Sequence, residues 1–259
     1  MKTSERAVYT LHSQLREFEY KVGQAIDIAR RGFAAMKRPC ASLSFGKDSV
    51  VMVHLLLSLD SDLPIMYVNC GDFDEFPDTG RVKQEFTTLT GCNLIELSGP
   101  SIVEYYRRAG LYVQDEEDTP EARRAQREYG DSLADILDGE AHRRGFDGAF
   151  IGVRREESDN RKRLFAMRGS LYFAKTRQLW ACYPLAFWTA RDVWAYIVKH
   201  GLPYNELYDL APEGRELARN GAMFGTRSAR YGRLRFLQRM YPDWFNRFAG
   251  EFPEVRCFI

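Results

Sequence analysis

The chain has 259 residues, of which 45% are hydrophobic and 28% are charged, and its net charge is only +1. This composition is typical of a soluble globular protein with one large domain, or with one domain and a smaller appendage. No apolar run approaches the ~20 residues that cross a bilayer, and the N-terminus lacks a signal peptide's apolar core, so we expect a cytoplasmic protein with no membrane contact.

The predicted elements begin with a long helix and continue with alternating strands and helices. Residues 5–37 carry apolar side chains at three- and four-residue steps, which predicts one long N-terminal helix. Buried strands are predicted at five short apolar runs, residues 40–44, 63–69, 93–97, 148–153 and 178–185. Helical patterns separate these strands at 48–59, 80–90 and 101–145.

A further helix is predicted over residues 189–201, because Thr189 is a good capping residue and a glycine ends the pattern. Strands that alternate with helices indicate an α/β fold, with a parallel five-stranded sheet covered by helices on both faces. We expect one domain over residues 1–210 and an arginine-rich helical C-terminal extension over residues 211–259.

The loop "SFGKDS", residues 44–49, joins the first strand to its helix. Backbone N–H groups and a helix N-terminus at this edge of a parallel sheet attract an anion. Lys47 adds a charge, Ser44 and Ser49 add hydroxyl groups, and Gly46 lets the backbone approach a ligand. The pattern is not the kinase-type loop, which needs G-x-x-x-x-G-K-[ST]. The alternative is an ordinary strand–turn–helix connection.

Four segments resemble, in the same order, motifs of the PP-loop ATP pyrophosphatases, and most closely those of the phosphoadenosine phosphosulfate reductase family. The segments are "SFGKDS", "VNCGDFDEFPDT", "GVRREESDNR" and "CYPLAFWTARDVWAYI". The resemblance spans roughly residues 38–209 and implies the PP-loop adenine-nucleotide alpha-hydrolase-like fold. The wider family includes the sulfate adenylyltransferase small subunit and the ATP pyrophosphatases of DNA phosphorothioation.

The resemblance implies that ATP is split between its α and β phosphates, which releases pyrophosphate and leaves AMP on an acceptor oxygen. Lys47, Asp48 and Arg154 are then expected to act in catalysis, because fixed cations and N–H donors stabilise a leaving pyrophosphate. The implied nucleotide-binding residues are Ser44, Phe45, Gly46, Lys47, Asp48, Ser49, Asp72, Arg154, Glu157, Ser158 and Arg161.

Asp48 and Asp72 are the residues that we expect to help hold Mg²⁺ on the phosphates. Asp48 is equally suited to cap its helix, and Asp72 to lie in a solvated acidic turn. Phe45 stands where the family has a glycine, so a third hypothesis is a nucleotide-binding protein without catalysis. Trp188, Asp192 and Trp194 are interpreted as packing and capping residues.

The five cysteines form no CxxC pair, so we expect neither a zinc ribbon nor an iron–sulfur cluster. Cys257 lacks the Gly and His of the reductases' E-C-G-x-H segment, which argues against reduction. Cys70 ends the second strand and Cys182 precedes the family's Pro-Leu, so either is a candidate catalytic carrier of a persulfide from a cysteine desulfurase. The alternative is that both are buried strand cysteines.

The region from 211 to 250 holds eight arginines and three acidic residues. On a helical wheel for 227–241, one face carries Leu234, Leu237, Met240 and Tyr241. Arg235 and Arg239 point away from this face, whereas Arg230 and Arg233 lie on it. The 227–239 segment is therefore predicted to contact nucleic acid. The 3′-phosphate of a phosphoadenosine nucleotide and an arginine-coated packing helix are the alternatives.

We therefore expect an ATP pyrophosphatase that activates an oxygen for sulfur insertion, in DNA phosphorothioate modification with a cysteine desulfurase. The alternative is a phosphoadenosine phosphosulfate reductase or sulfate adenylyltransferase-like enzyme of sulfate assimilation. The long N-terminal helix offers a surface for a homodimer.

Overall fold

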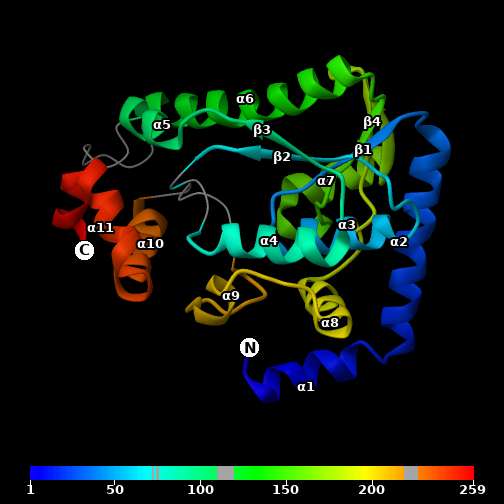
Figure 1. Cartoon of the computed structure of the whole chain (residues 1–259), viewed down its shortest axis with the longest axis horizontal. Coiled ribbons are helices and arrows are strands. Elements are labelled where there is room, and N and C mark those ends of the chain that lie inside the picture. The colour runs from blue at the N-terminus through cyan, green and yellow to red at the C-terminus, as the bar shows by residue number, and fades with distance from the viewer. Residues whose placement is uncertain (72, 74–75, 110–119, 219–226) are drawn as a thin grey trace.

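A computed structural model describes all residues except 72, 74–75, 110–119 and 219–226 (Figure 1). Its centre is a six-stranded sheet in the order β3-β2-β1-β4-β6-β5, and only β5 runs antiparallel to its neighbour. The strands are β1 (Pro39–Ser42), β2 (Ile65–Asn69), β3 (Leu94–Ser98), β4 (Gly148–Phe150), β5 (Leu171–Ala174) and β6 (Leu179–Cys182). The predicted parallel α/β fold is confirmed, with one strand more than expected.

The additional strand, β5, forms a hairpin with β6 at the edge of the sheet. Its four residues, "LYFA", are all apolar, but the run is short and only Ala174 is buried in the structure. The turn between the two strands contains Gln178 at φ 53°, a left-handed conformation without a glycine. Both features explain why the sequence did not predict this strand.

The predicted N-terminal helix is two helices, α1 (Thr3–His12) and α2 (Arg16–Ala35). The chain bends at Ser13, whose hydroxyl donates to the carbonyl of Thr10. α1 packs on α8 (Ala190–His200), whereas α2 packs on α3 (Lys47–Leu57) and β6. The prediction of one uninterrupted helix at 5–37 was wrong, because the apolar pattern continues through the bend and does not mark it.

The remaining helices are α4 (Thr79–Thr90), α5 (Ile102–Ala109), α6 (Pro120–Arg144), α7 (Asp159–Arg168), α9 (Leu207–Leu210), α10 (Arg227–Met240) and α11 (Pro242–Glu251), with short 3-10 turns at Arg155–Glu157 and Pro253–Phe258. The helices predicted near 48–59, 80–90 and 189–201 are confirmed. The helical stretch at 101–145 is α5 and α6, and residues 110–119 lie outside the described residues.

Helices cover the sheet on both faces, as Figure 1 shows. Ala41 and Ile65 point toward a core that includes residues of α2, α3, α4 and α8. Their strand neighbours Cys40 and Met66 point toward α6 on the opposite face. This alternation buries the central strands on both sides, and it leaves the carboxyl ends of the strands as the place where loops gather.

The C-terminal helices α10 and α11 pack against residues that follow β2 and against α5, in a second apolar cluster. Leu234 and Leu237 are buried there, while Arg235 and Arg239 are exposed, as the helical wheel predicts. Arg233 lies over the ring of Phe76 at 5.0 Å, and burial lowers the pKa of its guanidinium. Among the described residues, none of the helices is both long enough and apolar enough for a membrane span.

Candidate functional site

The loop after β1 takes its shape from Phe45. This residue has φ 53°, a left-handed conformation that favours glycine, and its side chain is 1% exposed. Its ring packs against Tyr67 and Phe86, with centroid distances of 4.9 and 6.5 Å. Burial of the ring offsets the backbone strain of about 1 kcal/mol or more. Phe45 therefore anchors the loop from the core, and it does not line the pocket described below, although it was predicted as a binding residue.

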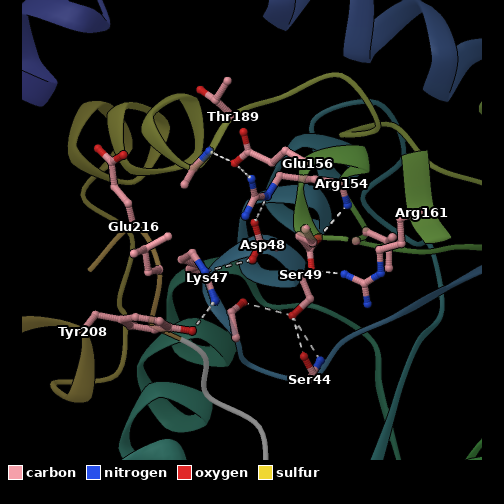
Figure 2. Close-up of a pocket in the computed structure, with 16 residues that line it drawn as sticks. Ser44, Lys47, Asp48, Ser49, Arg154, Glu156, Arg161, Thr189, Tyr208 and Glu216 are labelled. Carbon is pink, nitrogen blue, oxygen red and sulfur yellow. Dashed lines mark hydrogen bonds and ion pairs between the residues drawn. The ribbon is translucent and has the colours of Figure 1, made fainter. Parts of the chain in front are cut away.

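The first turn of α3 faces a pocket, and the loop before it is closed by two serines (Figure 2). The Ser49 hydroxyl accepts from the Ser44 N–H at 3.1 Å, lies 3.1 Å from the Ser44 hydroxyl, and donates to the Gly46 carbonyl at 3.0 Å. Gly46 is the N-cap and has no side chain to neutralise the helix end. The positive end of the α3 dipole is therefore directed at the pocket.

Lys47 is a buried cation in the wall of this pocket, with 4% of its side chain exposed. Its ammonium lies 3.3 Å from Asp48 Oδ2, donates to the Ala218 carbonyl at 3.2 Å, and sits 5.2 Å from the ring centre of Tyr208. A cation held in this way offers charge to an anion with little reorganisation.

Arg154 brings a second buried cation to the same place from the end of β4. Gly152 permits this approach, because a Cβ at that residue would lie 2.9 Å from Ser49 Cα. The guanidinium of Arg154 is 3% exposed; its Nε donates to Asp48 Oδ1 and its Nη1 pairs with Glu156. Asp48 is therefore bound by cations on both of its oxygens.

The segment after Arg154 is held by Glu157 and Ser158. Glu157 accepts from the Arg154 N–H at 2.7 Å and pairs with Arg161 through its second oxygen. Ser158 caps α7 by accepting from the Arg161 N–H at 3.2 Å. Arg161 and Glu157 line the pocket, whereas Ser158 supports the helix that carries Arg161.

The pocket has a volume of about 670 Å³, within the ~300–1,000 Å³ range of small-molecule sites. It brings together most of the predicted binding residues from the loop and from the segment after β4. The lining also includes side chains that the sequence did not indicate. These are Glu156, Tyr208, Glu216 and Leu217, with Thr189 and Ala190 at the start of α8. Glu156, Thr189 and Ala190 stand inside two of the quoted motifs and were open to prediction, whereas Tyr208, Glu216 and Leu217 lie outside all four.

The cysteines are placed away from this pocket. All five are described, and none of them lines it. Cys182 is fully buried with Sγ 3.6 Å from the Ile28 carbonyl, and burial raises the pKa of its thiol to about 12. Cys70 is 7% exposed and lines a different cavity of about 330 Å³ beside Phe73, Lys83 and Trp244. Cys257 is exposed near the C-terminus.

The expected magnesium ligands form no ready-made metal site in the described part of the chain. Asp48 is engaged by Lys47 and Arg154, and Asp72 lies outside the described residues. Within the described ranges, no group of three or more His, Cys, Asp or Glu side chains is arranged to hold a metal ion. Asp48 thus holds the two buried cations in position.

Sequence comparisons identify the family. The phosphoadenosine phosphosulfate reductase domain matches residues 38–224. Sulfate adenylyltransferase subunit 2 of Pseudomonas entomophila is 27% identical over 221 residues, which cover 77% of this chain and 68% of the relative. Adenosine 5'-phosphosulfate reductase of Geobacillus thermodenitrificans is 31% identical over 172 residues, which cover 64% of this chain and 65% of the relative.

Solved structures share the fold. Phosphoadenylyl-sulfate reductase from Candida auris, in a phosphate complex, superposes with a TM-score of 0.54 at 15% identity, over 81% of this chain and 92% of that one. The U34-tRNA thiolase NcsA from Methanococcus maripaludis, solved with its [4Fe-4S] cluster, gives 0.53 at 15% identity, over 93% and 78%. With the match over residues 38–224, the chain belongs to the phosphoadenosine phosphosulfate reductase domain family, a family of enzymes in the PP-loop superfamily.

Proposed function

We propose that the protein is an ATP pyrophosphatase, which transfers AMP to an acceptor oxygen and releases pyrophosphate. The observation that carries this proposal is the convergence of two buried cations, Lys47 and Arg154, with the N-terminus of α3 on one pocket. Such an arrangement suits a triphosphate, because its negative charge is met by fixed groups rather than by mobile surface side chains.

The chemistry follows from where charge develops. An acceptor oxygen forms a bond to the α phosphorus of ATP while the bond to the β-phosphate oxygen breaks, so the departing pyrophosphate gains negative charge. Lys47 and the first turn of α3 lie where that group would bind, and Arg154 stands beside them on Asp48. Groups fixed in advance stabilise this charge more in the transition state than in bound ATP.

Mg²⁺ would bind at this site together with the nucleotide, because the described carboxylates alone are not arranged to hold a metal ion. Bound to the phosphate oxygens, Mg²⁺ would supply further neutralisation of the triphosphate. Asp48 is assigned to the cations rather than to the metal.

The positions of the cysteine thiols favour adenylation over reduction. Reduction of a sulfonucleotide needs a thiolate that reaches the sulfonyl sulfur, and none of the five cysteines lines the pocket. Adenylation needs only the phosphate-binding groups and an acceptor oxygen. Cys257 is exposed outside the pocket, and it lacks the Gly and His that accompany the cysteine in the reductases' E-C-G-x-H segment.

For the acceptor, we propose a phosphate oxygen of DNA that is activated for sulfur insertion, with a cysteine desulfurase as sulfur donor. Support comes from exposed Arg235 and Arg239 on α10, and from Cys70 in its own cavity at the end of β2. The second candidate acceptor is sulfate, because sulfate adenylyltransferase subunit 2 matches over 77% of this chain.

The acceptors are separated by one set of incubations. The protein is supplied with ATP and Mg²⁺, and then with either sulfate, or DNA together with cysteine and a desulfurase. DNA phosphorothioation predicts sulfur in the nuclease-digested DNA by mass spectrometry, and a salt-dependent loss of DNA binding in Arg235→Glu/Arg239→Glu. Transfer of AMP to sulfate, without sulfur insertion into DNA, would instead support sulfate as the acceptor. Lys162→Ala, an exposed lysine outside the pocket, is the control.

A further inference from the structure

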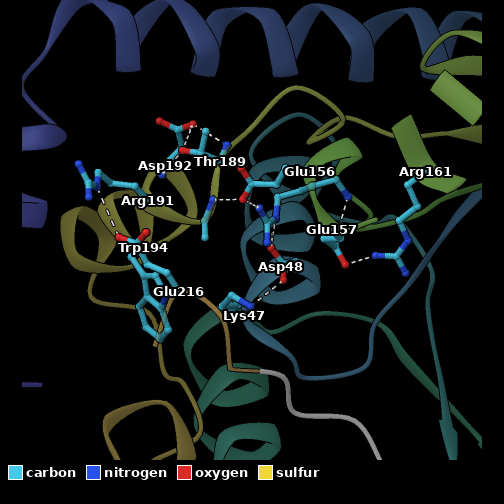
Figure 3. Close-up of polar contacts among 12 residues, drawn as sticks. Lys47, Asp48, Glu156, Glu157, Arg161, Thr189, Arg191, Asp192, Trp194 and Glu216 are labelled. Atoms are coloured by element: carbon cyan, nitrogen blue, oxygen red, sulfur yellow. Dashed lines mark hydrogen bonds and ion pairs between the residues drawn. The ribbon is translucent and has the colours of Figure 1, made fainter. Parts of the chain in front are cut away.

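Glu156 occupies an unusual position between a buried cation and a helix N-terminus (Figure 3). One of its oxygens, Oε1, pairs with Arg154 Nη1 and also accepts from the Ala190 N–H at 2.6 Å. Ala190 is the first residue of α8, so the carboxylate lies at the positive end of that helix. The side chain is 38% exposed and lines the pocket.

The contacts of Arg154 show what this carboxylate does. Asp48 accepts from Nε, and Glu156 pairs with Nη1, so carboxylates hold two of the three nitrogens of the guanidinium. Nη2 has no partner among the described residues, and it is not one of their fully buried unpaired atoms. Because Arg154 lines the pocket, the Nη2 side remains for a ligand. Because the guanidinium is planar, contacts at Nε and Nη1 also fix the direction in which Nη2 points.

The start of α8, which holds Glu156, is itself rigid. Thr189 and Asp192 form a capping box, in which the Thr189 side chain accepts from the Asp192 N–H. Asp192 is fully buried and also binds His12 at 2.8 Å and Lys21 at 2.9 Å, side chains of α1 and α2. The position of the Ala190 N–H is therefore set by contacts from three helices.

We propose that Glu156 is a positioning residue, which fixes the Arg154 guanidinium so that Nη2 faces the anionic group of the bound substrate. The inference rests on the proposed function in assigning that group to the pyrophosphate part of ATP. Glu156 acts through Arg154 and need not touch the substrate. This role is distinct from that of Glu157, which binds the Arg154 backbone and Arg161.

A double-mutant cycle on inorganic pyrophosphate binding tests this role. Calorimetry compares wild type, Glu156→Ala, Arg154→Ala and the double variant. Glu156→Ala should weaken binding about tenfold in the wild-type background, and should cause no further loss once Arg154 is alanine, since contacting residues are coupled. Asp159→Asn, an exposed aspartate of the same segment paired only with Lys162 among described residues, should leave affinity unchanged.

The outcomes separate positioning from a general structural role. Equal losses in both backgrounds, or no loss in the wild-type background, would overturn the proposal. If Glu156→Ala does not fold, the same cycle with Glu156→Gln, which keeps an oxygen for Ala190 and Arg154, should show coupling of about threefold. Wild-type protein that fails to bind pyrophosphate also overturns it. Binding without any pyrophosphate formed from ATP would instead refute the proposed function and leave this inference standing.

Discussion

At the scale of the residue, the pocket is defined by cations that have little contact with water. The side chains of Lys47 and Arg154 are 4% and 3% exposed, and Asp48 pairs with both. Burial of a charge is costly unless it is paired, so Asp48 makes these positions possible before any ligand binds. The same pairing holds the Asp48 carboxylate between the two cations, one on each oxygen.

Replacement of Lys47 tests the role of the buried ammonium. Lys47→Ala should lower the rate of pyrophosphate release about 10²–10³-fold, as loss of one preorganised donor to a developing charge does elsewhere. Coupled phosphate detection after pyrophosphate hydrolysis measures the rate. Lys162→Ala removes an exposed lysine and should keep the wild-type rate. A Lys47→Ala rate within threefold of wild type would contradict the assignment.

The cysteines provide a second prediction at this scale. Burial raises the pKa of Cys182 to about 12, so its thiol stays protonated at neutral pH and is shielded from reagents. Iodoacetamide should modify exposed Cys257 in the native protein, and Cys182 only after unfolding. Persulfide from a desulfurase should likewise be absent from Cys182. Peptide mass spectrometry measures both the iodoacetamide label and the persulfide. Labelling of Cys182 in the native protein as fast as Cys257 would refute the prediction that Cys182 is shielded.

At the scale of the element, α8 links the N-terminal helices to the pocket. Its capping box presents the Ala190 N–H to Glu156, and its buried Asp192 binds side chains of α1 and α2. Burial alone would raise the pKa of Asp192, but hydrogen bonds from His12, Lys21 and Thr189 outweigh it and lower the pKa below its ordinary value of 3.8. The ionised carboxylate therefore stabilises the fold.

This pKa shift predicts how stability depends on pH. Because the pKa of Asp192 is lower in the folded state, its contribution is complete above pH 3.8 and is lost as pH falls through the folded-state value. Asp192→Asn should reduce the free energy of unfolding by about 2 kcal/mol at pH 7, since it weakens hydrogen bonds to charged groups. Urea unfolding at several pH values should show this difference shrinking in acid.

An exposed aspartate supplies the matched control for that experiment. Asp27, with 74% of its side chain exposed, pairs only at 3.8 Å with Arg30 on the surface of α2. Asp27→Asn should change the free energy of unfolding by less than about 0.5 kcal/mol at any of these pH values. A pH-independent loss in Asp192→Asn would show that its charge is not what stabilises α8.

At the scale of the whole molecule, predictions from sequence succeeded where a pattern is local. The apolar runs of the central strands, the capping signal at Thr189 and the strand-to-helix connection at 44–49 all depend on a few neighbouring residues. The pocket also contains Tyr208 and Glu216, which the chain places there by returning over α8. Such residues carry no periodic signal, because only the tertiary fold makes them neighbours of Lys47.

Phe45 shows the same limit of prediction from local sequence, at a residue that the motif itself marks as unusual. The sequence marks it as a departure from the family's glycine but does not tell where its ring lies. The structure places the ring between Tyr67 and Phe86, side chains from β2 and α4. Long-range packing decides the loop's conformation, so Phe45 supports the loop between β1 and α3 from the core.

The central claim is that the α–β phosphate bond of ATP is the one broken, and ³¹P nuclear magnetic resonance of the reaction tests it most directly. With ATP, Mg²⁺ and the acceptor that supports turnover, we predict signals of pyrophosphate and of AMP, free or bound to the acceptor. Lys47→Ala should suppress both signals together. Formation of ADP and inorganic phosphate, or ATP that remains intact with every acceptor while bound to the wild-type protein, would contradict the account.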